Sequence, residues 1–60
     1  MIVKNANQIR SGEWVKENKN DKFNQVIAVI KDDKEVFMAF SGGYKKSKTY
    51  SPDDKFFVKE

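Results

Sequence analysis

The residues whose types and spacing best suit chemistry lie in one short segment, residues 43–50. It interleaves lysines with two tyrosines and contains no acidic residue: Tyr44, Lys45, Lys46, Lys48 and Tyr50. Its lysines alone supply as much positive charge as the net +3 of the whole chain. Lysine ammonium groups neutralise phosphates and tyrosine rings stack on unpaired bases, so the segment predicts contact with nucleic acid. The alternative is a solvated loop whose lysines keep a sheet edge from aggregating, with the tyrosines packed on the rim of the fold.

A second basic and aromatic group surrounds Trp14, the only tryptophan of the chain. Lys16 follows it in the same predicted strand, and Lys19 and Lys22 lie in the next loop. Together they would extend the nucleic-acid surface, although acidic residues are interspersed among them. The alternative is that Trp14 fills the core, because a domain this small needs its largest side chain there. We expect the core position for Trp14.

Catalytic and metal chemistry would have to proceed without its commonest residues. The chain contains no histidine and no cysteine, which are the usual general base, nucleophile and metal ligands near neutral pH. Two pairs of adjacent carboxylates could hold a cation or act as acid and base, Asp32 with Asp33 and Asp53 with Asp54. Each pair lies in a predicted turn, where capping and turn hydrogen bonds explain it. We therefore expect a non-enzymatic protein with no cofactor and no metal site.

The length of 60 residues suits one small domain, residues 1–60, whose core is compact or shared with a partner. The first residues lack the apolar region of a signal peptide, and no apolar run approaches the roughly 20 residues that span a bilayer. We expect a cytoplasmic protein without membrane contact, which suits the missing cysteines.

The element that must position these side chains is a central hairpin. Residues 23–30 and 35–40 are predicted strands, and the polar residues 31–34 form the turn between them. Simple alternation in the first strand separates two sides: Val26, Ala28 and Ile30 against Phe23, Gln25, Ile27 and Val29.

Both sides of this hairpin are apolar, and this surplus has two explanations. It either completes a tight core or forms a protein-binding face that includes Phe37, Ile27 and Val29, and such a face could also make a homodimer.

Shorter elements flank the hairpin. Residues 1–10 allow a short helical turn capped by Asn5 or an edge strand that starts at Ile2 and Val3. We favour an extended lead-in with Ile9 packed inward, followed by a turn at Gly12 and a strand over residues 13–17. Residues 51–54 are predicted to form one helical or 3₁₀ turn, and residues 56–58 a closing strand. These elements predict an all-β fold, a small antiparallel barrel of four to five strands with one 3₁₀ or helical turn before the last strand.

The sequence resembles the SH3-like small barrels, including KOW- and Tudor-type modules. The resemblance rests on three stretches: the opening of residues 9–15, the central hairpin, and the turn at 51–54 before the closing strand. It implies a binding module of that barrel fold.

The leading expectation is a non-enzymatic module that contacts nucleic acid through the segment 43–50 and Lys16, by charge and stacking. The alternative is a small phage-type regulatory or inhibitor protein that binds a host protein through the face of its central hairpin.

Overall fold

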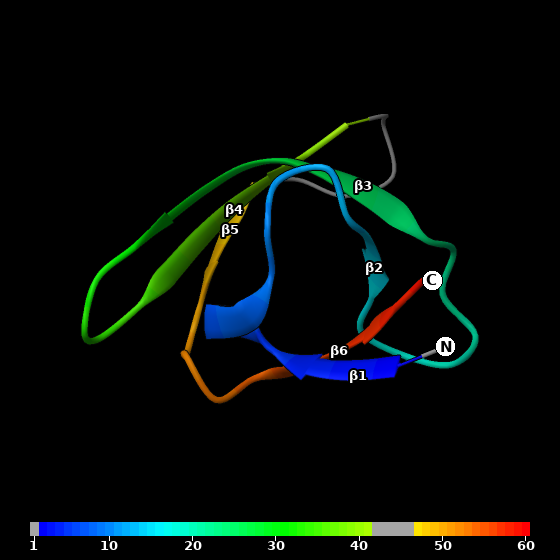
Figure 1. Ribbon diagram of the computed structural model, residues 1–60, viewed down its shortest axis with the longest axis horizontal. Coiled ribbons are helices and arrows are strands. Elements are labelled where there is room, and N and C mark those ends of the chain that lie inside the picture. The colour runs from blue at the N-terminus through cyan, green and yellow to red at the C-terminus, as the bar shows by residue number, and fades with distance from the viewer. Residues whose placement is uncertain (1, 42–46) are drawn as a thin grey trace.

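The computed structural model describes residues 2–41 and 47–60, and within them the chain is all-β, as expected (Figure 1). One 3₁₀ turn and six strands follow one another in these residues: β1 (Ile2–Asn5), η1 (Ala6–Gln8), β2 (Trp14–Lys16), β3 (Asn24–Lys31), β4 (Val36–Phe40), β5 (Lys48–Tyr50) and β6 (Lys55–Val58). The strands form one open antiparallel sheet in the order β1-β6-β2-β3-β4-β5. The described strands outnumber the expected four to five, because β1 pairs along β6 as an additional edge strand.

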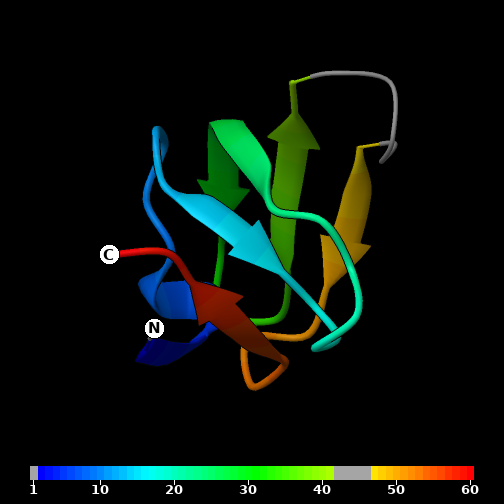
Figure 2. The same cartoon turned by 90° about the vertical axis from the view of Figure 1, so that its right-hand side faces the viewer.

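The long strand β3 curls this sheet. Its first residues pair with β2, whereas residues 28–31 pair with β4. Figure 2 shows the result, in which β2 and β6 cross in front of β4 and β5. No helix in the described part of the chain has the length and apolar character needed to cross a membrane.

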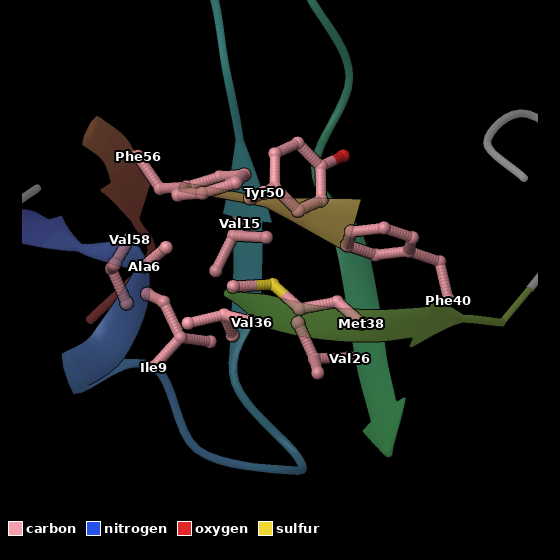
Figure 3. Packing of buried hydrophobic residues seen from close by; sticks show 10 residues of the cluster. All are labelled: Ala6, Ile9, Val15, Val26, Val36, Met38, Phe40, Tyr50, Phe56 and Val58. Atoms are coloured by element: carbon pink, nitrogen blue, oxygen red, sulfur yellow. The ribbon is translucent and has the colours of Figure 1, made fainter. Parts of the chain in front are cut away.

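The core lies inside this curl and takes one or more side chains from every described element except β1 (Figure 3). Its members are mostly branched aliphatic and aromatic: Ala6, Ile9, Val15, Val26, Val36, Met38, Phe40, Tyr50, Phe56 and Val58. The inward position of Ile9 is confirmed. Val15, and not Trp14, is the core residue of β2, so the expectation for Trp14 is wrong.

A β-bulge in β3 decides which side chains face the core. The pairing with β4 shifts between Val26 and Ala28, so that Ile27 is an extra residue in the ladder. After the bulge the alternation resumes out of phase: Val29 pairs with the buried Met38, whereas Ile30 points away from the core. The expected grouping of Val26 with Ala28 and Ile30 is therefore wrong, because simple alternation does not include the extra residue.

Two turns close the ends of the fold. Gly12 has the positive φ expected for its turn, 98°, and its N–H donates to the Val26 carbonyl at 2.6 Å. Residues 51–54 form a hydrogen-bonded turn, in which Asp54 N–H donates to the Ser51 carbonyl at 3.0 Å. In the described residues the 3₁₀ turn is η1, which lies near the N-terminus and not before the last strand. Ala6 N–H joins the two regions by donating to the Asp54 carbonyl at 2.7 Å.

Candidate functional site

The structure puts the residues of the expected nucleic-acid segment in different surroundings. Tyr44, Lys45 and Lys46 lie outside the described residues. Tyr50 is only 4% exposed, because it pairs with the buried Val36 and shares its inward direction. The expectation that Tyr50 offers its ring to a base is therefore wrong.

The Tyr50 ring is instead held by aromatic neighbours. Its centroid lies 5.0 Å from that of Phe56 and 6.5 Å from that of Phe40, both in edge-on geometry. The Lys48 ammonium lies 5.3 Å from the centroid of the same ring, a cation–π contact that draws this lysine towards the core edge.

The hydroxyl of Tyr50 is buried at the end of this ring, pointing away from Phe56 (Figure 3). It has no hydrogen-bond partner among the described residues. Burial raises the pKa of the phenol above its ordinary value of 10.0, and the negative charge of Asp54 raises it further. The tyrosine therefore acts as a structural residue that carries an uncompensated polar atom.

The two described lysines of the expected site lie on opposite sides of the sheet. Lys48 alternates with Tyr50 in β5 and so starts from the inner side, whereas Lys16 follows the buried Val15 and points outward. The Lys16 ammonium lies 4.8 Å from the centroid of the Phe23 ring. The sheet therefore does not bring Lys16 and Lys48 together into one phosphate-binding surface.

Trp14 lies on the outer side of β2 and is 45% exposed. Its direct partner on β3 is Gln25, and on the other side Lys59 N–H donates to the Trp14 carbonyl at 2.8 Å. Because Val15 takes the inward position, the adjacent Trp14 must face solvent.

The outer side of the hairpin carries a separate group of exposed apolar side chains. Ile30 and Phe37 lie opposite each other on β3 and β4 and are 68% and 37% exposed. Ile27, at the bulge, is 54% exposed. Trp14 is not part of this surface: Val15 of β2 and Val36 of β4 point from two layers into the same core, so the outer sides of these strands face away from each other. We call Ile27, Ile30 and Phe37 the outer patch.

The outer patch differs from the expected protein-binding face at one position. Val29 is partly buried and packs against the core, so the expectation that it faces a partner is wrong. Ile30 takes its place, and no local sequence signal distinguishes a bulge at Ile27 from a regular strand. Phe37 and Ile27 are exposed as expected.

The described strand positions around the patch carry no charge. On the outer side of β3, β4 and β5 they hold apolar or uncharged polar side chains: Ala28, Ile30, Phe37, Ala39 and Thr49. Ala28 and Ala39 lie opposite each other among these positions. Charged residues make up 35% of the chain, so their absence over this row sets it apart from the rest of the surface.

The hairpin turn fixes one end of this surface. The Asp32 carboxylate accepts the backbone N–H groups of Lys34 at 2.7 Å and Glu35 at 2.9 Å. These two hydrogen bonds lower the pKa of Asp32 below its usual value. The expected role of this aspartate in turn formation is confirmed, and the turn holds the Ile30–Phe37 pair in register.

No three acidic side chains gather in residues 2–41 and 47–60 in a way that could hold a metal ion. No protein-family model matches the chain, and neither a curated protein nor a solved structure matches it.

Proposed function

We propose that this chain is a non-enzymatic protein-binding module whose outer patch contacts a protein partner. One observation carries the proposal: Ile27, Ile30 and Phe37 are all exposed on the outer side of the hairpin, beside strand positions without charge. Interface cores are depleted in charged residues and enriched in aromatic ones. Exposed apolar side chains of this size on one face mark an interaction site more often than scattered single residues do.

The geometry suits recognition because the patch is built on strands. Two of its members, Ile30 and Phe37, form a direct cross-strand pair. Aromatic side chains are enriched in interface cores, since a rigid ring covers a large area at low entropic cost. We therefore assign the main binding contribution to Ile30 and Phe37.

The strand order supports our proposal that the fold is SH3-like. Strands β2 to β5 are consecutive neighbours, and β6 returns to pair with β2. A series of five short antiparallel strands in which the last returns to the first suits a small barrel, and β1 adds an edge strand to it. A fold class does not identify a binding partner, so the proposed function rests on the outer patch.

The test is affinity capture from nuclease-treated extract of the cells that produce the protein. Wild-type chain is compared with Ile30→Ser and Phe37→Ser, and with Thr49→Ser as a control on the same face. A specific protein retained by wild type and control, and lost with both patch variants, would support the proposal. Equal retention by all four chains would contradict it.

A second function, binding of nucleic acid, is favoured by one observation. Trp14 is exposed, Lys16 follows it on β2, and Lys59 lies across from it. This arrangement supports a basic aromatic surface, which a Trp14 buried in the core could not have formed. The leading expectation therefore remains a proposal, with Trp14 in the place of Tyr50 as the stacking residue.

Fluorescence of the single tryptophan tests this second function directly. Single-stranded oligonucleotides should quench Trp14 emission, with an affinity that falls steeply as salt increases because phosphate contacts release counterions. Lys16→Ala should reduce the affinity and its salt dependence, whereas Lys34→Ala in the hairpin turn should not. Emission that stays unchanged at low salt would exclude this mode.

A further inference from the structure

The layer formed by β1, β6, β2 and the start of β3 has an outer side that faces away from the outer patch. In Figure 2 this layer lies in front of β4 and β5, so its outer side is turned towards the viewer. Strand alternation decides which side chains it carries, because Val15, Phe56 and Val58 point into the core. The side chains on this outer side, which we call the basic face, are Val3, Asn5, Trp14, Lys16, Phe23, Gln25, Lys55, Phe57 and Lys59.

The ionised side chains of the basic face are all positive. Lys16, Lys55 and Lys59 occupy three of its positions, and none of its positions holds an acidic residue. Glu17 and Glu60 lie past the ends of β2 and β6. A face with this distribution of charge complements an anionic partner.

The aromatic side chains of the basic face lie close together. Trp14 is exposed and Phe57 is half-buried. Lys59 is the direct partner of Trp14 across β2 and β6. Phe57, two residues earlier, is therefore a diagonal neighbour of Trp14, at a distance of about 7–8 Å. Two rings placed in this way can each stack on one base of an unpaired strand.

Two of the three lysines are held in place on the basic face. The Lys16 ammonium donates to the Lys19 carbonyl at 2.8 Å and lies 4.8 Å from the centroid of the Phe23 ring. The Lys55 ammonium donates to the side-chain oxygen of Asn5, its direct partner on β1. An ammonium group has three donors, so each lysine keeps donors for a phosphate oxygen. Fixing these side chains in advance reduces the entropy that binding would cost.

We propose that the basic face binds single-stranded nucleic acid, with bases stacked on Trp14 and Phe57 and phosphates contacted by its lysines. The inference rests on the second function proposed above and names its ligand class and its site. Charge and rings select this ligand together, because an acidic peptide has no bases and a duplex keeps its bases inside its own stack. Since the basic face and the outer patch face away from each other, one chain can hold a nucleic acid and a protein at once.

The experiment is fluorescence anisotropy of a labelled oligonucleotide of about 12 nucleotides, within the usual site size of small single-strand-binding folds. The same sequence is offered as a single strand and as a duplex, and poly-L-glutamate serves as a polyanion without bases. We expect the single strand to bind about fivefold or more tightly than the duplex, because only its bases can stack on the rings. Poly-L-glutamate should compete weakly.

Removal of one ring separates stacking from charge. Phe57→Leu keeps an apolar side chain at this half-buried position but loses the ring, and it should weaken single-strand binding about fivefold or more. Phe37→Leu makes the same change on the outer patch and is the matched control, which should bind like wild type. Circular dichroism of both variants must show the wild-type β spectrum, so that a lost ring is not mistaken for a lost fold.

The lysines are tested by the salt dependence of the same binding. Lys55→Gln and Lys59→Gln should each make the slope of log affinity against log salt shallower by about 0.7, the contribution of one phosphate contact on a single strand. Lys34→Gln, an equal change of charge in the hairpin turn, should leave the slope unchanged. All three lysines are exposed, so these variants test the basic face even if Phe57→Leu does not fold.

Three results would overturn the inference: equal binding of single strand, duplex and poly-L-glutamate, a folded Phe57→Leu that binds like wild type, or a salt slope indifferent to both substitutions on the basic face. The second proposed function survives each of these if oligonucleotides still quench Trp14 emission. It fails as well if no oligonucleotide binds at low salt. The protein-binding proposal is independent of all these results, because its test depends on Ile30 and Phe37.

Discussion

Ile30 and Phe37 face each other directly across β3 and β4, and both point away from the core. The next pair along the same two strands, Val29 with Met38, points towards it. One hairpin therefore presents an apolar pair to water and an apolar pair to the core within two adjacent positions. Exposed and buried apolar residues at this point should respond very differently to mutation.

Ile30→Thr should change the free energy of unfolding by at most about 1 kcal/mol, because only the exposed cross-strand contact with Phe37 is altered. Met38→Ala should cost about 2–5 kcal/mol, since it empties a fully buried position. Urea denaturation followed by circular dichroism measures both, and Met38→Leu serves as the volume-conserving control. An Ile30→Thr variant as unstable as Met38→Ala would show that Ile30 belongs to the core.

Tyr50→Phe should stabilise the protein by about 1 kcal/mol, because it removes a buried hydroxyl that no described residue hydrogen-bonds. The pKa of the phenol is raised in the folded state. Its contribution to stability is therefore fully present below the unfolded pKa of about 10 and is lost as pH rises through the higher folded value.

Thermal unfolding measured from about pH 8 to about pH 11 should show a loss of stability in wild type that is smaller in Tyr50→Phe. Lysine deprotonation affects both chains equally, so the difference between them isolates Tyr50. Identical alkaline limbs for the two chains would contradict the burial of this hydroxyl.

Glu13→Gln should lower stability by about 0.5–1 kcal/mol at about pH 7. Partial burial opposes ionisation of Glu13, but hydrogen bonds from the Lys4 ammonium and the Arg10 N–H, with their charges, outweigh it and lower the pKa. This stability is present above the unfolded pKa of 4.5 and is lost as pH falls through the lower folded value.

Stability curves of wild type and Glu13→Gln should therefore converge towards about pH 3. Asp33→Asn, which removes one acidic charge at an exposed position, controls for net charge. A gap between Glu13→Gln and wild type that persists in acid would assign the effect to packing instead of ionisation.

Gly12→Ala should destabilise the protein by about 1 kcal/mol, because a residue with a Cβ is strained at a φ of 98°. No atom lies within 4 Å of the added Cβ, so backbone strain alone is responsible. Gly12→Asn should cost less, since asparagine tolerates positive φ better. Equal midpoints for Gly12→Ala and wild type in urea would contradict the assigned turn conformation.

The sequence predicted the all-β class, the central hairpin, the Gly12 turn and the inward position of Ile9. These follow from local signals: short β-branched runs, turn residues and a glycine at a break. An edge strand at Ile2 and Val3 was one alternative, but its pairing with β6 was not predicted, because that pairing joins residues at opposite ends of the chain.

The candidate site was predicted less well, for two physical reasons. Trp14 was expected in the core on grounds of size, but the strand can turn only one of Trp14 and Val15 inward, and Val15 fits. The sides of the sheet expected for Val29 and Ile30 are the reverse of those observed, because the extra residue at Ile27 reverses the alternation. Tyr50 was judged by its chemical type, although its position opposite Val36 decides that it is buried.

The extra residue in β3 has a consequence for related chains that lack one residue of this strand. Losing Ile27 or Ala28 would restore a regular strand and leave every remaining side chain on its present side. Losing Val29 instead would turn Ile30 inward and Lys31 outward, exchanging a hydrocarbon for an ammonium group at the contact surface. A one-residue gap in related proteins should therefore fall at positions 27 or 28 and not further along the strand.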